Sequence, residues 1–147
     1  MNMSLDRFIE AQRRDYAVAL EELRQGEKKS HWIWYVLPQG LFPGAAGKSL
    51  YYALKDDAEA VAYLSHPDLG KRYAECIAVI HAQIIKQGIE PEALMGSDVD
   101  AKKLHSSLTL MLRALKSAAL QDNDKARPWL ADLRRQAAAL IPRLPKF

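Results

Sequence analysis

The sequence is poor in cysteine, and it has no long hydrophobic run and no strong excess of charge of one sign. Its single cysteine, Cys76, excludes a disulfide within the chain. No run of about 18 apolar residues is present, and the first residues lack the basic and then apolar pattern of a secretory signal. We therefore expect a cytoplasmic protein that neither crosses a membrane nor is secreted.

Positive charge is present without being concentrated. The chain has 21 Lys and Arg against 18 Asp and Glu, a formal net charge of +3 at pH 7. The basic pairs are scattered along the chain: Arg13-Arg14, Lys28-Lys29, Lys102-Lys103 and Arg134-Arg135. A dedicated nucleic-acid-binding protein usually gathers such charge and interleaves it with aromatic residues. Scattered pairs are typical of solvated helix faces, so we do not expect a nucleic-acid partner.

The spacing of apolar residues predicts an all-α fold. The 147 residues, 49% hydrophobic and 27% charged, suit one globular domain. Apolar residues recur at helical spacing in five segments, bounded by Gly26, Pro67, Gly88 and Pro142. We therefore expect a compact single-domain fold over residues 1–147 with about five main helices: residues 5–23, from 56 or 57 to 65, 68–88, from 97 or 98 to a loop at 121–124, and 127–140, with a short turn at 91–94.

A glycine-rich stretch at residues 40–47 invites comparison with a phosphate-binding loop. Gly47-Lys48-Ser49 matches the end of G-x-x-x-x-G-K-[ST], but the first glycine of that motif falls on Phe42. The rest of the chain supplies no set of parallel strands, so we do not expect a nucleoside triphosphatase. Lys48 remains a candidate, because a short helix starting there would favour an anion. The alternative is a flexible surface loop with an exposed lysine.

Other common catalytic and metal-binding patterns are missing. The four histidines have no spacing typical of zinc ligands, and no G-x-S-x-G motif is present. Cys76 lies in a helical stretch and is expected to be a buried small hydrophobe. The sequence therefore indicates no metal and no cofactor.

Two segments carry more polar and aromatic residues than packing requires. The first contains Lys28, Lys29, Ser30, His31, Trp32, Trp34, Pro38 and Gln39. The second contains Asp100, Lys103, Ser106, Ser107 and Thr109. On a helix the lysine and the hydroxyls of the second segment share adjoining faces, which suits an anion or sugar hydroxyls. Alternatively, the hydroxyls bond to carbonyls of the preceding turn and the lysines are solvated.

His31 and the two tryptophans of the first segment also have two interpretations. His31 could donate or accept a proton beside an aromatic wall. Alternatively, His31 is structural, and Trp32 and Trp34 fill the core with their indole nitrogens bonded to backbone carbonyls.

The chain resembles a bacterial family of conserved proteins of unknown function that often carries the misleading label calpastatin. The matching residues span about 4–112 and include Leu5-Asp6-Arg7-Phe8, Ser30-His31-Trp32-Ile33-Trp34, His66-Pro67 and Lys103-Leu104-His105-Ser106-Ser107-Leu108-Thr109-Leu110. The resemblance implies a compact all-α fold and brings no established reaction. Calpastatin-type inhibitors are long, repetitive and disordered, unlike this chain. The loop at residues 40–48 and the tail after Ala118 depart from the family pattern.

We favour a protein that binds or hydrolyses a small anionic metabolite, phosphorylated and nucleotide-like, in a polar and aromatic pocket. The candidate catalytic residues are His31, Asp100 and Lys103. The candidate ligand-binding residues are Trp32, Trp34, Gln39, Lys48, Ser106, Ser107 and Thr109. A protein-interaction module without catalysis is the alternative, and it would need an exposed apolar patch and buried serines as spacers.

A second, fainter similarity concerns the order of the helices. A tryptophan-rich helix start, an alanine-rich helix pair and a late lysine-bearing helix resemble the helical N-glycosidases that act on ADP-ribose-like and riboflavin-precursor substrates. No motif matches residue by residue. Such chemistry needs a carboxylate and cations for phosphate, for which Asp100, Lys103 and His31 are the candidates.

Overall fold

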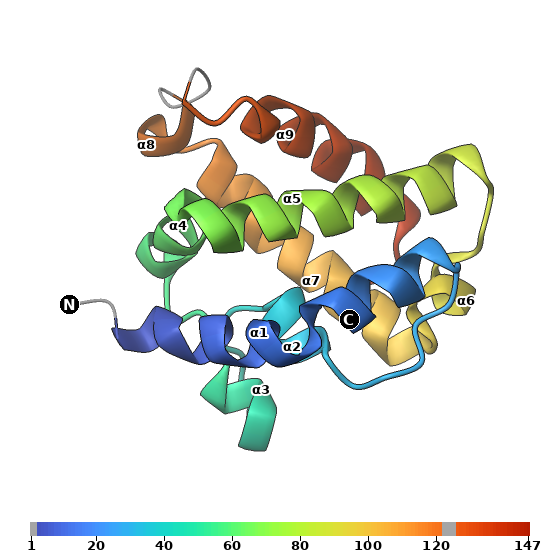
Figure 1. The fold of residues 1–147 in the computed structure, drawn as a ribbon, viewed down its shortest axis with the longest axis horizontal. Helices are drawn as coiled ribbons and strands as arrows, with labels where there is room; N and C mark the ends of the chain where they lie inside the picture. Colours follow the sequence, from blue (N-terminus) through green and yellow to red (C-terminus); the bar gives the residue numbers. More distant parts are fainter. Residues whose placement is uncertain (1–2, 122–125) are drawn as a thin grey trace.

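The protein is all-α, as its apolar periodicity predicts. The structure, a computed structural model, describes residues 3–121 and 126–147, and within them the chain forms helices and no strand. One isolated parallel bridge joins Gly40 to Leu54. Helix α5 crosses the middle of the molecule, with α1 on one side, α9 on the other and α7 behind it (Figure 1).

Helix α1 (Met3–Arg24) begins the fold and ends as its sequence predicts. Its apolar stripe is buried, including Leu5, Phe8 and Leu23. The backbone then turns at Gly26, whose φ of 87° favours glycine, and the Gly26 amide donates to the Leu23 carbonyl. The following loop leads to α2 (Ile33–Val36), a short helix packed against α1.

Helices α4 (Asp57–Ser65) and α5 (Pro67–His81) meet at a tight junction. The Glu59 amide donates to Asp56 Oδ1 at the start of α4, and the ring nitrogen Nδ1 of His66 accepts from the amides of Asp68 and Leu69 at the start of α5. Both starts agree with the sequence prediction. Between α2 and α4 the chain forms α3 (Gly47–Tyr51), which carries Lys48.

The predicted helix over residues 68–88 changes type before its end. Helix α5 passes into a π-helix, Ala82–Lys86. There the side-chain amide of Gln83 donates through Nε2 to the backbone carbonyls of Leu23 and Arg24 at the free end of α1, at 2.9 Å each. The widened turn thus satisfies the carbonyl end of a neighbouring helix. Helix α6 (Pro91–Met95) follows, as expected.

Helix α7 (Asp98–Leu115) begins where the sequence predicts, because the Ser97 hydroxyl accepts from the Asp100 amide. It ends earlier than expected: the Ser117 hydroxyl donates to the Ala114 carbonyl, and a separate short helix, α8 (Ala118–Gln121), follows. Asp122 to Asp124 of the predicted loop lie outside the described residues. Helix α9 (Trp129–Leu140) and a 3-10 turn (Ile141–Arg143) complete the chain.

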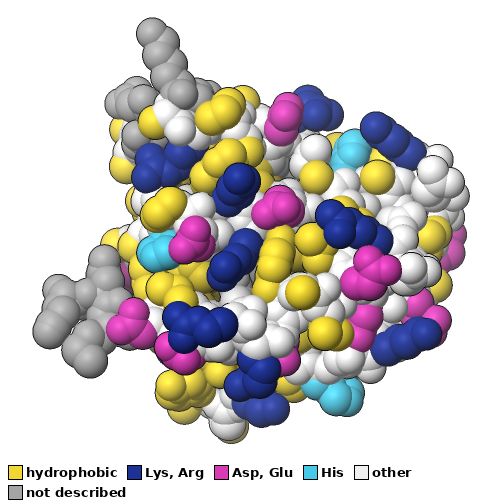
Figure 2. Space-filling view, in the orientation of Figure 1, with side chains coloured by type: hydrophobic (Ala, Val, Ile, Leu, Met, Phe, Trp, Pro, Cys, Tyr) yellow, Lys and Arg dark blue, Asp and Glu magenta, His cyan; other side chains and the backbone are white. Residues whose placement is uncertain are grey.

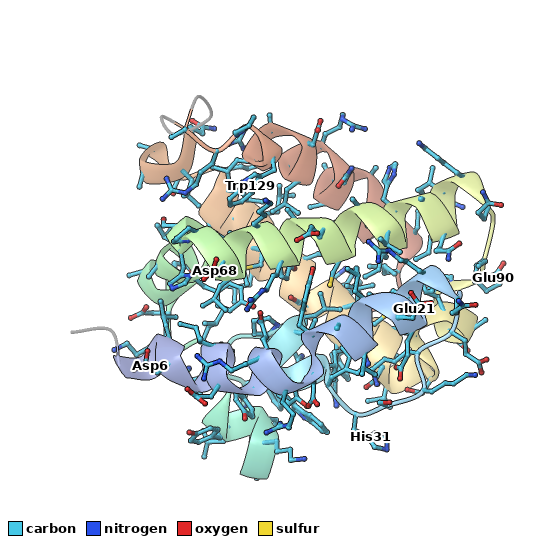
Figure 3. The ribbon with its side chains drawn as sticks, in the orientation of Figure 1. Asp6, Glu21, His31, Asp68, Glu90 and Trp129 are labelled. Carbon is cyan, nitrogen blue, oxygen red and sulfur yellow. The ribbon has the colours of Figure 1, made fainter. Side chains whose placement is uncertain are left out.

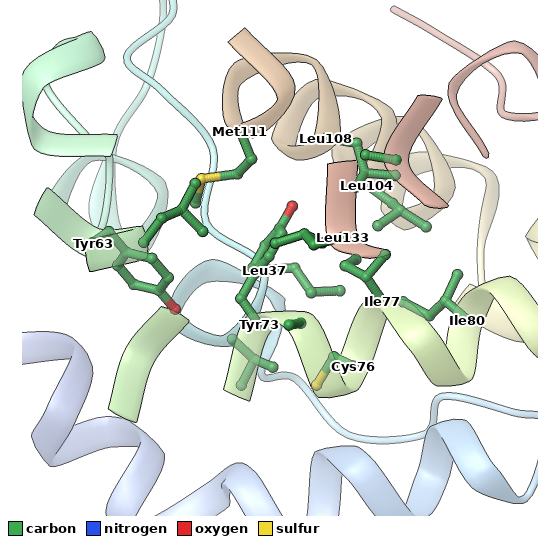
Figure 4. Packing of buried hydrophobic residues seen from close by; sticks show 14 of the residues in the cluster. Leu37, Tyr63, Tyr73, Cys76, Ile77, Ile80, Leu104, Leu108, Met111 and Leu133 are labelled. Atoms are coloured by element: carbon green, nitrogen blue, oxygen red, sulfur yellow. The ribbon is translucent and has the colours of Figure 1, made fainter. Parts of the chain in front are cut away.

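The core lies between α4, α5, α7 and α9 (Figure 4). Cys76 is fully buried there, and burial raises the pKa of its thiol to about 12, as expected for a small hydrophobe. Gly70 lets α5 approach its neighbours, since a Cβ there would lie 2.1 Å from the Leu64 carbonyl oxygen and 2.7 Å from the Trp129 ring.

The surface carries both signs of charge. On the face seen in Figure 2, Lys and Arg side chains are spread out and interspersed with Asp and Glu. Within residues 3–121 and 126–147, none of the helices is both long enough and apolar enough to span a membrane.

Candidate functional site

The two segments singled out in the sequence meet in space. Lys28 Nζ lies 2.8 Å from Asp100 Oδ2 and donates to the Ser30 carbonyl at 2.6 Å. The Lys28 side chain is only 4% exposed, so these partners take the place of water around its charge. Lys103 Nζ lies 3.6 Å from the other oxygen, Asp100 Oδ1. The loop after α1 is thereby joined to the first turns of α7.

Glu22 of α1 holds the same loop from its other side. Its carboxylate accepts from the backbone amides of Lys29 and Ser30, from the Ser30 hydroxyl and from the indole nitrogen of Trp32. Partial burial acts to raise the pKa of Glu22, but these hydrogen bonds outweigh it and lower the pKa to about 2. This role of Glu22 in holding the loop was not predicted, because no local pattern links Glu22 to residues seven to ten positions later.

The two tryptophans have different environments. Trp32 is 1% exposed, and its indole nitrogen donates to Glu22 Oε1 at 2.8 Å. The structural interpretation accounts for these contacts, with a carboxylate in place of the expected backbone carbonyl. Trp34 is half-buried, and two ammonium groups lie near its ring: Lys48 Nζ at 4.9 Å and Lys103 Nζ at 5.3 Å from the centroid. We call Trp34, Lys48 and Lys103 the Trp34 cluster.

Other predicted residues lie apart from one another. His31 is exposed and points outward from the loop between α1 and α2 (Figure 3). Ser107 is fully buried in the core, where its hydroxyl lies 2.9 Å from the Tyr73 hydroxyl. The Gln39 carbonyl accepts from the Leu54 amide at 2.9 Å. A role of these three residues in catalysis or ligand binding stays a prediction.

A cleft of 370 Å³ opens along α7, beside the loop that follows Gln39. We call it the α7 cleft, and it is lined by Gly40, Leu41, Phe42, His105, Ser106, Thr109, Leu110, Arg113, Lys146 and Phe147. Ser106 and Thr109 are predicted ligand-binding residues. The cleft therefore lies between the end of the first segment and the second segment.

Among the described residues, no Asp or Glu side chain lines the α7 cleft, although Asp57 pairs with the lining residue Arg113. Arg113 donates through Nε and Nη2 to Asp57, and this exposed pair raises the pKa of Arg113 and lowers that of Asp57. Burial, and then the charge of Lys146, lower the pKa of His105. His105 is therefore neutral at pH 7. The Thr109 hydroxyl donates to the His105 carbonyl at 2.9 Å, so its lone pairs face outward as acceptors.

Only part of the lining of this cleft could be predicted from the sequence. His105 and Arg113 lie four residues before and after Thr109, so the helical spacing that selected Ser106 and Thr109 could have found them. Lys146 and Phe42 come from distant parts of the chain, and no local pattern points to them.

A second surface is apolar. The segment at residues 41–51, a loop that leads into α3, exposes four large hydrophobic side chains: Leu41, Phe42, Leu50 and Tyr51. Leu41, Leu50 and Tyr51 also line a cavity of 740 Å³ against α1. Arg7 holds the base of this loop by donating to the carbonyls of Tyr51 and Ala53. We call these four exposed residues the apolar loop.

Comparison with known proteins identifies the family. A family model described as "Protein of unknown function (DUF1810)" matches residues 2–127. The chain belongs to this family. It is also similar to the conserved hypothetical protein Rv1873 from Mycobacterium tuberculosis, whose crystal structure shows 35% sequence identity, covers 97% of this chain and 99% of that chain, and superposes with a TM-score of 0.71. No curated protein matches.

Membership of the DUF1810 family confirms the sequence resemblance, and the helical structure confirms the expected all-α fold. Neither the family description nor the name of the mycobacterial protein states a ligand or a reaction. Within the described residues, no three His, Cys, Asp or Glu side chains gather closely enough to hold a metal ion. The α7 cleft, the Trp34 cluster and the apolar loop are therefore the features of this family member that suggest a function.

Proposed function

We propose that the protein binds a small phosphorylated metabolite in the α7 cleft. The supporting observation is the charge of its lining: the cations Arg113 and Lys146 border it, and no Asp or Glu side chain does among the described residues. Its volume of 370 Å³ lies within the usual range for small-molecule sites, about 300–1,000 Å³. The cleft thus combines positive charge, hydroxyl groups and a suitable size.

Individual groups suit a phosphate. The Asp57 pair uses Nε and Nη2 of Arg113, so Nη1 can donate to a ligand oxygen. The Lys146 ammonium and the Ser106 hydroxyl add further donors, and charge-assisted bonds of this kind are the stronger class. Phe42, which is 41% exposed, offers an aromatic face for a nucleobase. We therefore propose a nucleotide-like ligand.

Calorimetry with AMP and with inorganic phosphate tests this proposal. We expect the wild-type protein to bind AMP, and we expect Arg113→Gln and Lys146→Gln each to weaken binding by about 10- to 150-fold, since a lost charge-assisted bond is worth about 1.5–3 kcal/mol. Lys116→Gln is the matched control, because Lys116 is exposed on the same helical segment and does not line the cleft. Absence of binding by a folded protein, or equal binding by all variants, contradicts the proposal.

The proposal concerns binding, and hydrolysis of the ligand stays a prediction. Both oxygens of Asp100 face ammonium groups, at 2.8 Å from Lys28 and 3.6 Å from Lys103. N-glycosidase activity on ADP-ribose-like substrates would require Asp100, and chromatography of ADP-ribose after incubation with wild type and Asp100→Asn tests it directly.

The apolar loop favours a second candidate function, a protein-interaction module. Leu50 is 51% and Tyr51 62% exposed, beside the 740 Å³ cavity, and exposed apolar patches often mark binding surfaces. The double variant Leu50→Ser with Tyr51→Ser should no longer bind a partner that the wild type recovers from cell extract, and its binding of AMP should be unchanged. A partner retained by this double variant would contradict the interaction proposal.

A further inference from the structure

Two cations from distant parts of the chain meet at one aromatic ring. Lys48 comes from α3 and Lys103 from α7, and both ammonium nitrogens lie within 5.3 Å of the Trp34 ring centroid. The indole attracts each cation, and the cations repel each other. The arrangement therefore concentrates positive charge at a half-buried surface.

The carboxylates nearby do not balance this charge. Asp100 is the acidic partner of both Lys103 and Lys28, and Lys28 is the closer of the two. Lys48 makes no ion pair with any described carboxylate. Asp15 lies near enough for the charge of Lys48 to contribute to lowering its pKa, but Asp15 is already bonded to Arg14 and the Tyr35 hydroxyl. Asp100 thus pairs with Lys28 and Lys103, and Lys48 adds a third ammonium group that has no ion-pair partner among the described residues.

The Trp34 cluster adjoins the α7 cleft. Lys103 precedes Ser106, a lining residue of the cleft, by three positions on α7, and side chains at this spacing are neighbours with Cβ atoms about 5–6 Å apart. Lys103 and Arg113 are ten positions apart on α7, about 15 Å along the helix, so a ligand that reaches both needs two well-separated anionic groups.

We propose that Lys48 and Lys103 at the Trp34 ring bind a second anionic group of the ligand held in the α7 cleft, so that the ligand is a bisphosphate with well-separated phosphate groups. This inference rests on the proposed function of the cleft. One anionic group lies at Arg113 and Lys146, and the other lies at Lys48 and Lys103. The ammonium groups then share a ligand anion in addition to Asp100.

The test compares phosphate, pyrophosphate and fructose 1,6-bisphosphate as probes. Nuclear magnetic resonance follows the indole N–H signal of Trp34, assigned with Trp34→Phe, and the ring signals of His105 in the cleft. We expect phosphate to shift the His105 signals alone. Fructose 1,6-bisphosphate should shift both, bind about tenfold more tightly than phosphate, and lose that advantage in Lys48→Gln and Lys103→Gln. Pyrophosphate is the control for charge, because its phosphate groups are too close together to reach both sites, and an equal advantage for pyrophosphate would contradict two separated subsites.

Matched controls separate this site from general charge effects. Lys102→Gln removes the same charge beside Lys103, but Lys102 pairs with Asp98, so the variant should keep the tenfold advantage. If fructose 1,6-bisphosphate shifts His105 and leaves Trp34 unchanged, or if Lys48→Gln and Lys103→Gln bind it as wild type does, the second subsite is wrong and the cleft proposal stands. If no probe shifts His105, the cleft proposal itself is wrong.

Discussion

The ammonium of Lys28 lies 2.8 Å from the carboxylate of Asp100, in a contact that leaves the Lys28 side chain 4% exposed. This ion pair joins the loop after α1 to α7, and so it joins the two segments that carry the candidate site. Removing one partner of a buried pair leaves the other charge without compensation, which is more costly than loss of a surface pair.

We expect Lys28→Met to lower the free energy of unfolding by about 3 kcal/mol, the low end for a broken buried pair, because Lys103 still faces Asp100. Urea denaturation at pH 7 measures this change. The adjacent exposed residue supplies the control, and Lys29→Met should change stability by no more than about 0.5 kcal/mol. Equal effects of the two substitutions would show that the ion pair does not secure the loop.

Glu22 should make the stability of the protein depend on acid pH. Its pKa is lowered from 4.5 to about 2 in the folded protein, so the unfolded chain binds its proton first as the pH falls. The stabilisation is complete above about pH 4.5 and is lost as the pH falls through about 2. The free energy of unfolding, measured by denaturation at pH values between 7 and 2, should therefore fall less steeply with decreasing pH for Glu22→Gln than for wild type. The exposed neighbour serves as control: Glu21→Gln should follow the wild-type slope.

Gly70 should not tolerate a side chain. A Cβ at this position would lie 2.1 Å from the Leu64 carbonyl oxygen and 2.7 Å from the Trp129 ring, so Gly70→Ala must separate helices of the core. We expect a loss of about 3 kcal/mol, the upper range for overpacking, measured by thermal denaturation. At Gly40 a Cβ would meet atoms no closer than 3.5 Å, so Gly40→Ala should cost far less. A Gly70→Ala protein as stable as wild type would refute this packing.

Ser107 should stabilise the folded protein, because its hydroxyl is buried against that of Tyr73. Ser107→Ala leaves the Tyr73 hydroxyl without this partner and should cost about 1–3 kcal/mol. The double variant with Tyr73→Phe removes both hydroxyls and should regain much of that loss. Ser106→Ala, on the half-buried face beside it, should leave stability nearly unchanged and weaken AMP binding. The opposite pattern would place Ser107 in the ligand site.

The helices could be predicted where local chemistry determines them. Gly26, Asp56, His66-Pro67 and Ser97 mark boundaries by capping and backbone preference, and the structure confirms each one. The early end of α7 could not be foreseen, because the apolar spacing continues beyond Leu115. Nor could the π-helix, since its stabilising contact is between Gln83 and the distant end of α1.

The candidate site was predictable along α7, and Trp34 and Lys48 were also candidates from the sequence, but their meeting with Lys103 was not predictable. Helical spacing placed Lys103, Ser106 and Thr109 on adjoining faces, and the structure shows two of them in the cleft and one at Trp34. The meeting of Lys28 with Asp100 depends on contacts 72 residues apart, which a periodic pattern does not encode. The contribution of Lys146 depends in the same way on how the end of the chain packs.

The central claim, that the α7 cleft binds a phosphorylated metabolite, is tested most directly by the pKa of His105. Burial and Lys146 lower this pKa below 6.5 in the ligand-free protein, and a phosphate in the cleft would stabilise the protonated ring. We predict that saturating AMP raises the His105 pKa, measured by nuclear magnetic resonance, and leaves unchanged that of His81, whose pKa is lowered by burial and by Arg135 and Lys86 away from the cleft. A His105 pKa that stays the same with AMP and with inorganic phosphate would contradict the account.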